Sequence, residues 1–185
     1  LSGLPKNQVI GTGTAIDSAR LQNMIAQTVN VDPRSVHAYS MGEHGDSQMV
    51  PWSTVTIAGK PFYDVIADNK ELVGDVDLDE LVYRTTQEGW EIFNRKGTTY
   101  YGIATACVGV IKAILNDENR IIPVSTLLEG EYGERDVYAG VPTVLNRSGA
   151  YDVLEIHMTP GELARFKEST RVIREYTDRI MKLNL

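Results

Sequence analysis

The spacing of hydrophobic residues changes several times along this chain, and each change predicts a different element. Residues 14–30 have apolar side chains at helical spacing, which predicts an amphipathic helix with Thr14 as N-cap and Asp17 in the capping-box position. Residues 36–41 and 52–65, rich in β-branched side chains, predict a strand and a hairpin. A polar, glycine-containing loop is expected between them and the next helical region.

In the second half of the chain, blocks with helical spacing of apolar residues alternate with blocks rich in β-like residues. Residues 78–115 predict one long helix or two, with Gly97 as the break, because glycine weakens a helix interior by about 1 kcal/mol relative to alanine. Three β-like runs follow at residues 121–128, 137–145 and 152–156. Thr159, followed by proline, glycine and glutamate, then predicts the start of a helix that reaches residue 183.

This order of elements predicts an α+β fold with long helices on an antiparallel sheet, because the connections between the strands are short. We expect residues 1–185 to form a single domain. The helix positions expected to be buried are Leu81, Trp90, Phe93, Ile103, Val110, Ile111, Ile114, Leu163, Phe166, Ile173, Ile180 and Met181.

The composition narrows the class of protein. With 185 residues, 42% of them hydrophobic, the chain can bury a sizeable core without a disulfide or a metal. Cys107 is the only cysteine, which excludes an intramolecular disulfide and a cysteine-rich metal cage. A net charge of −7 argues against nucleic acid or an anionic membrane as the main partner. The first residues lack the features of a secretory signal, so we expect a cytoplasmic location.

Three residues form a candidate site for a small carboxylate substrate. Asp17 and Arg20 are three residues apart and share a helix face, and the guanidinium can hold a carboxylate through two hydrogen bonds. His44 lies in a turn between glycines and can donate or accept a proton near neutral pH. If the three meet, Arg20 binds the anion, His44 moves the proton and Asp17 orients the imidazole.

Other interpretations of these residues remain open from the sequence. Asp17 and Arg20 also suit a helix cap with a surface ion pair, and His44 an ordinary turn. Glu43, His44 and Asp46 could form a metal site, but their spacing is not that of His-Glu-x-x-His, and no metal is expected. A serine hydrolase would need a Gly-x-Ser-x-Gly elbow, which the sequence lacks.

The glycines near the start do not form a nucleotide-binding motif. Gly11-Thr-Gly-Thr-Ala-Ile16 has isoleucine where the dinucleotide fingerprint requires its third glycine, and it lacks the strand–helix–strand setting. There is no Walker A loop either. The sequence therefore carries no usual cofactor-binding motif.

Taken together, the motifs resemble a known family. Asp17-Ser-Ala-Arg20, Gly42-Glu-His-Gly-Asp46 and Lys96-Gly-Thr-Thr99, in this order and spacing, resemble the C-terminal half of L-lactate dehydrogenases of the bacterial type. The resemblance covers nearly the whole chain, and it implies the fold of the lactate/malate dehydrogenase C-terminal domain. It also implies a homotetramer.

The resemblance implies reduction of pyruvate, or a related 2-keto acid, to L-lactate with NADH, as in fermentation. By motif match, His44 donates the proton, Asp17 orients it and Arg20 binds the substrate carboxylate. Thr99 corresponds to a threonine of the substrate pocket, and Ile103 to a residue that packs near the nicotinamide. In this family the dinucleotide-binding domain precedes the matching segment, so we expect this chain to be the catalytic domain alone and inactive without that half.

Two features qualify the resemblance. His37 matches the histidine that binds fructose 1,6-bisphosphate in activated enzymes, but Gln22 stands where an arginine is expected, so we expect weak or no activation. Gln22 is also reminiscent of L-2-hydroxyisocaproate dehydrogenases, which act on bulkier 2-keto acids. A non-catalytic oligomerisation module is the alternative from a different functional class.

Overall fold

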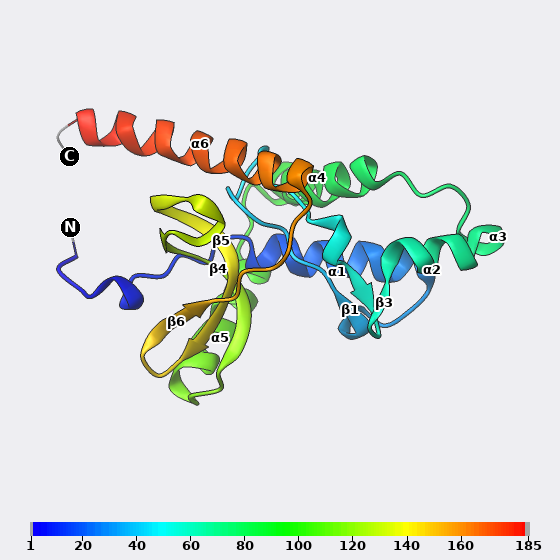
Figure 1. The fold of residues 1–185 in the computed structure, drawn as a ribbon, viewed down its shortest axis with the longest axis horizontal. Coiled ribbons are helices and arrows are strands. Elements are labelled where there is room, and N and C mark those ends of the chain that lie inside the picture. The colour runs from blue at the N-terminus through cyan, green and yellow to red at the C-terminus, as the bar shows by residue number, and fades with distance from the viewer. Residues whose placement is uncertain (1, 184–185) are drawn as a thin grey trace.

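Helix α1 (Ala15–Val29) crosses the middle of the molecule in the computed structural model, which describes residues 2–183 (Figure 1). Its extent confirms the predicted helix, and Asn30, with a left-handed φ of 54°, ends it. The predicted capping box is wrong. Thr14 occupies the N-cap position, but its hydroxyl makes no capping bond, and the carboxylate of Asp17 is bonded by other side chains described below.

A small antiparallel sheet beside α1 has the order β1-β2-β3. Its strands are β1 (Val36–His37), β2 (Thr56–Ile57) and β3 (Lys60–Pro61). The predicted strand at residues 36–41 is therefore much shorter, and the predicted hairpin forms only around residues 56–61. Its continuation to residue 65 is wrong, because helix α2 (Phe62–Asp68) begins at Phe62.

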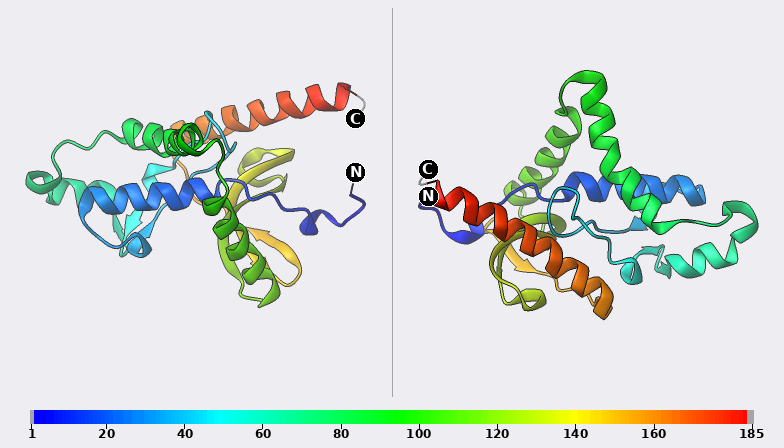
Figure 2. Two further views of the ribbon diagram at one scale, coloured as in Figure 1. Left: turned by 180° about the vertical axis from the view of Figure 1, so that it is seen from behind. Right: turned by 90° about the horizontal axis from the view of Figure 1, so that it is seen from above.

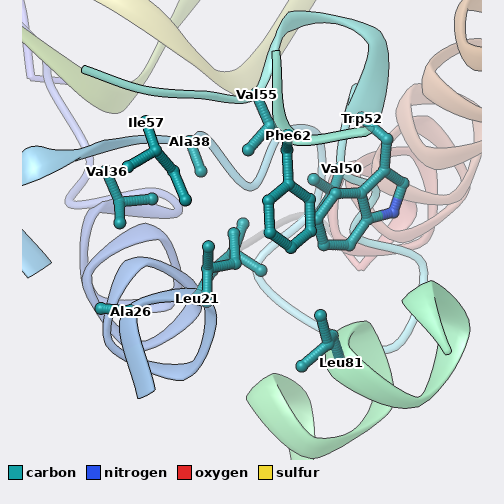
Figure 3. Close-up of a cluster of buried hydrophobic side chains, with 11 residues drawn as sticks. Leu21, Ala26, Val36, Ala38, Val50, Trp52, Val55, Ile57, Phe62 and Leu81 are labelled. Atoms are coloured by element: carbon teal, nitrogen blue, oxygen red, sulfur yellow. The ribbon is translucent and has the colours of Figure 1, made fainter. Parts of the chain in front are cut away.

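The reason for this helix is a short apolar face at helical spacing. Phe62, Val65 and Ile66 all pack against the cluster of buried side chains beneath α2. The Phe62 ring stacks on Trp52 with centroids 5.7 Å apart, and Figure 3 shows the two rings side by side. The expected loop that follows contains one further turn, α3 (Lys70–Val73).

The long helical region is two helices, as the glycine predicts. Helix α4 (Leu78–Lys96) ends at Gly97, whose φ of +75° is left-handed, and α5 (Tyr101–Leu115) then leaves at an angle (Figure 2, right). Leu81 and Val110 are buried as expected. The expectation is wrong for three others, Trp90, Phe93 and Ile111, which are exposed.

A larger antiparallel sheet has the order β4-β5-β6. Its strands are β4 (Arg120–Glu129), β5 (Arg135–Asn146) and β6 (Gly149–Val153). The third strand begins three residues before the predicted one and ends at Val153. It ends there because the Tyr132 hydroxyl binds the chain beyond it, donating to the carbonyl of Leu154 and accepting from the amide of Ile156.

Helix α6 (Pro160–Lys182) packs on this sheet through Phe166, and α5 packs on another part of it through Val110 and Ala113. The predicted capping box of α6 is present, since Thr159 and Glu162 exchange hydrogen bonds. Two of its expected core positions, Ile180 and Met181, are exposed. The last turns of α6 extend past the sheet, which explains the difference (Figures 1 and 2).

These elements confirm an α+β fold of helices packed on antiparallel sheets. Within residues 2–183, no helix combines the length and the apolar character needed to span a membrane. The larger sheet lies at the N-terminal end of α1, and the small sheet lies beside the half of α1 nearer its C-terminus (Figure 1). The first turns of α1 supply two of the candidate catalytic side chains.

Candidate active site

The first turns of α1 and the turn at residues 42–47 bring the three predicted side chains together. Asp17 is buried, with 2% of its surface exposed. Its Oδ2 lies 2.5 Å from Nδ1 of His44, and its Oδ1 lies 3.4 Å from Nη1 of Arg20. One carboxylate therefore links a histidine and an arginine that are distant from each other in the chain.

The carboxylate determines how His44 is protonated. Because an ionised Asp17 can only accept, Nδ1 of His44 donates to it, and Nε2 is the ring nitrogen that can face a ligand. The hydrogen bond that His44 donates to Asp17 raises the pKa of His44 above its ordinary value, against the opposing effects of partial burial and of the nearby Arg20 charge. His44 therefore keeps its proton to a higher pH than a free histidine.

These residues line a cavity of about 500 Å³. Asp17, Arg20 and His44 line it, and so do Thr99 and Ile103, the two further residues expected at the site. The remaining wall has three parts. Helix α4 contributes Thr86, Gly89, Trp90 and Phe93, the turn that carries His44 contributes Glu43, Gly45 and Asp46, and Ile16 and Gln48 come from elsewhere. All five residues expected at the site border one cavity.

Helix α4 supports the arginine directly. A Cβ added at Gly89 would lie 3.2 Å from Nη1 of Arg20, so the guanidinium rests against the backbone of α4 at a position without a side chain. Only 11% of the Arg20 side chain is exposed. Gln48, which donates to Thr86 at 2.5 Å and accepts from Ser40 at 2.6 Å, ties α4 to the segment that carries His44.

The α4 residues at the cavity were missed from the sequence. Thr86, Gly89, Trp90 and Phe93 recur at intervals of three, one and three, so they share one helix face. That mixture of polar, small and aromatic residues on one face was the available signal. It differs from a core face, whereas helical spacing alone predicts that Trp90 and Phe93 are buried.

The glycines at residues 11–14 have a packing role. The backbone of Gly11 pairs with Ser125 of β4 through bonds of 2.9 and 3.0 Å, and a Cβ at Gly13 would overlap the backbone there. They allow the chain before α1 to lie against the sheet.

The remaining candidate residues have other surroundings, although Glu43 and Asp46 also border the cavity. His37 and His157 are exposed, and neither borders the cavity. The Gln22 side chain donates to the carbonyl of Ala38 at 3.0 Å. In the described part of the chain no three His, Cys, Asp or Glu side chains are grouped as a metal site requires, and Glu43 is bonded by Ser47.

Comparison with known proteins identifies the same family that the sequence motifs resemble. The family profile described as lactate/malate dehydrogenase, alpha/beta C-terminal domain, matches residues 14–183. L-lactate dehydrogenase 3 of Bacillus cereus is 51% identical over 176 residues, which are 95% of this chain and 56% of that protein. L-lactate dehydrogenase 1 of Bifidobacterium longum is 46% identical over 180 residues, 97% of this chain and 57% of that protein.

Solved structures show the same similarity. The minor L-lactate dehydrogenase of Enterococcus mundtii in its ligand-bound form superimposes with a TM-score of 0.91 at 41% identity. The match covers 97% of this chain and 57% of that one. The chain therefore spans a little over half the length of the relatives it matches.

Proposed function

The chain belongs to the lactate/malate dehydrogenase family, matching its C-terminal alpha/beta domain, and we propose that it supplies the substrate-binding and proton-transfer half of an NAD-dependent L-lactate dehydrogenase. The proposed reaction is the reduction of pyruvate to L-lactate. The observation that carries the proposal is the single Asp17 carboxylate bonded to both His44 and Arg20 at the edge of one cavity.

Each of the three side chains has one task in this reaction. Arg20 binds the substrate carboxylate through two parallel hydrogen bonds, which fixes the orientation of the 2-keto group. His44 donates a proton from Nε2 to the oxygen that becomes the hydroxyl. Asp17 accepts from Nδ1 throughout and stabilises the positive imidazolium form. The raised pKa of His44 keeps a larger fraction of that donor protonated at neutral pH than in a free histidine.

The cavity suits the ring end of a nicotinamide cofactor. Ile16 and Ile103 give it an apolar wall on the same cavity as His44 and Thr99, and a flat ring can pack on such a wall without leaving a buried polar group unpaired. When bound, the cofactor supplies the hydride. Ile103 would contact its ring, and Thr99 would close the side of the cavity next to the substrate.

The proposal extends to partners. We expect a homotetramer in the cytoplasm, as implied for the family, and weak or no activation by fructose 1,6-bisphosphate. Gln22 supports the second expectation, because its amide already donates to a backbone carbonyl and it carries no charge for a phosphate. Of the two positions that match the fructose 1,6-bisphosphate site, only His37, exposed on β1, would then be basic.

A chimaera tests the proposed reaction. The matching C-terminal part of the Bacillus cereus relative, 51% identical, is replaced by this chain, and pyruvate-dependent NADH oxidation is measured. We expect turnover that is lost in His44→Asn and retained in His157→Asn, an exposed histidine outside the cavity. A folded chimaera that binds NADH without reducing pyruvate would support a non-catalytic module. Preferential reduction of a branched 2-keto acid would contradict the proposed substrate.

A further inference from the structure

Helix α6 contacts the turn that carries His44 through one buried side chain. Ser169 is fully buried, and its Oγ accepts the backbone N–H of Glu43 at 2.8 Å. The same Oγ lies 3.1 Å from Oγ of Ser47, at the other end of the turn. The neighbouring Thr170 is equally buried, but its hydroxyl donates to the carbonyl of Lys167 within its own helix. Ser169 therefore links α6 to the turn, and Thr170 does not.

The turn itself is built to accept this link. Gly42 has a φ of +89°, and a Cβ at this position would overlap the side chain of Ser169. The Gly42 backbone is paired with Gly140 of β5 through bonds of 2.8 and 2.9 Å. At the other end, Ser47 donates to the Glu43 carboxylate, which folds back over the turn at Gly45, where no side chain is in the way.

The His44 ring has little else to hold it. More than half of its side chain is exposed, and Asp17 contacts it only at Nδ1. Glu43 precedes His44 directly, so Ser169 fixes the backbone at the residue next to the histidine. The 2.5 Å bond to Asp17 forms only if the turn presents the ring at the correct place.

We propose that Ser169 is a positioning residue for His44: its hydroxyl, bound to the Glu43 amide and next to Ser47, holds the turn so that the imidazole meets both Asp17 and the substrate. The inference rests on the proposed function for its consequence in catalysis. Its geometric part, the placement of the ring beside Asp17, concerns this chain alone.

The test is a nuclear magnetic resonance titration of the His44 ring in the 185-residue chain, without cofactor or substrate. The charged groups that shift the pKa of the ring are Asp17, Arg20 and Glu43, and Asp46 lines the same cavity. Ser169→Ala replaces none of these four residues. We expect this variant to lower the pKa of His44 toward its ordinary value of about 6.5. Thr170→Val, which removes an equally buried hydroxyl from the same helix, should leave the titration unchanged.

Kinetics in the chimaera supply the second readout. We expect Ser169→Ala to reduce kcat by about 10- to 100-fold, because a small displacement of the proton donor is costly. KM for pyruvate should change by less than about threefold, because Arg20 and Thr99 do not lie on the turn. If the chimaera has no turnover at all, the proposed function fails, and the titration still decides the placement of His44.

Folding is checked by circular dichroism, and Ser47→Ala takes over the test if Ser169→Ala does not fold. This second variant removes the hydroxyl that bonds Glu43 and contacts Ser169, so the pKa of His44 should fall in the same direction. A titration identical to the parent in a folded variant overturns the inference. Equal shifts in Ser169→Ala and Thr170→Val overturn it too, because they would indicate only a general loss of packing.

Discussion

Replacing Arg20 with lysine keeps the positive charge at the site and removes its planar fork. The guanidinium rests against α4 at Gly89, and one of its nitrogens lies 3.4 Å from Oδ1 of Asp17. With 11% of the side chain exposed, water screens its interactions only weakly. A lysine ammonium can bind a carboxylate as a point charge, but it cannot offer two parallel donors.

The expected loss follows from one missing hydrogen bond. A hydrogen bond to a charged group contributes about 1.5–3 kcal/mol. At about 1.4 kcal/mol per factor of ten, Arg20→Lys should reduce kcat/KM for pyruvate by about 10- to 150-fold. Most of the change should be in KM, because the carboxylate is bound equally in the ground state and the transition state.

The assay is steady-state reduction of pyruvate by the chimaera, with NADH oxidation followed spectroscopically. Arg34→Lys is the matched control: its side chain is 91% exposed, pairs with Asp32 and lies outside the cavity. We expect the control to differ from the parent by less than about twofold, as for most surface changes. If Arg20→Lys retained kcat/KM within about threefold of the parent, the assignment of Arg20 as the carboxylate-binding residue would be wrong.

Three further outcomes are expected. Asp17→Asn removes the carboxylate that raises the pKa of His44, so the protonated donor is lost at lower pH, and the pH profile of pyruvate reduction should fall earlier than in the parent. With Gln22 in place of an arginine, the pyruvate saturation curve should be the same with and without fructose 1,6-bisphosphate; a large shift in half-saturation would contradict this. Phe166→Ala, which removes a fully buried ring beside Tyr132, should lower the free energy of unfolding by about 3–5 kcal/mol in urea titration, and an unchanged midpoint would contradict its place in the core.

The raised pKa of His44 also makes the stability of the fold depend on pH. A pKa that is raised in the folded state stabilises the fold below the unfolded value of about 6.5. This contribution is lost as the pH rises through the higher folded pKa. Because the His44 side chain is more than half exposed, the catalytic pH profile is a better readout than the free energy of unfolding.

The elements best predicted from the sequence are those with a complete local signal. The break at Gly97 and the capping box of Thr159 and Glu162 need only residues within a few positions of each other, and both are present. Helix α2 was missed because its face, set by Phe62 and Val65, is only one turn long and follows residues of high β-propensity. A period cannot be recognised over so few residues.

Spacing in the sequence places Asp17 and Arg20 on one helix face, but no spacing brings His44 to them. The meeting depends on tertiary contacts, including the pairing of Gly42 with Gly140 and the buried hydroxyl of Ser169. Neither contact has a periodic signal in the sequence. The residue types were informative because an arginine and a histidine that share a carboxylate suit proton transfer to a small carboxylate substrate. The resemblance to a known family indicates the same chemistry.

The apolar positions that were wrongly expected to be buried have a common explanation. Trp90 and Phe93 on α4, Ile111 on α5 and Ile180 on α6 all follow helical spacing, yet each is at least 46% exposed. Hydrophobic periodicity indicates which face of a helix is apolar, but it does not identify what covers that face. For Trp90 and Phe93 the cavity supplies an answer, because a bound ring and substrate would cover them. For Ile111 and Ile180, no side chain among residues 2–183 covers the position, so helical spacing alone predicts a burial that the packing of these residues does not supply.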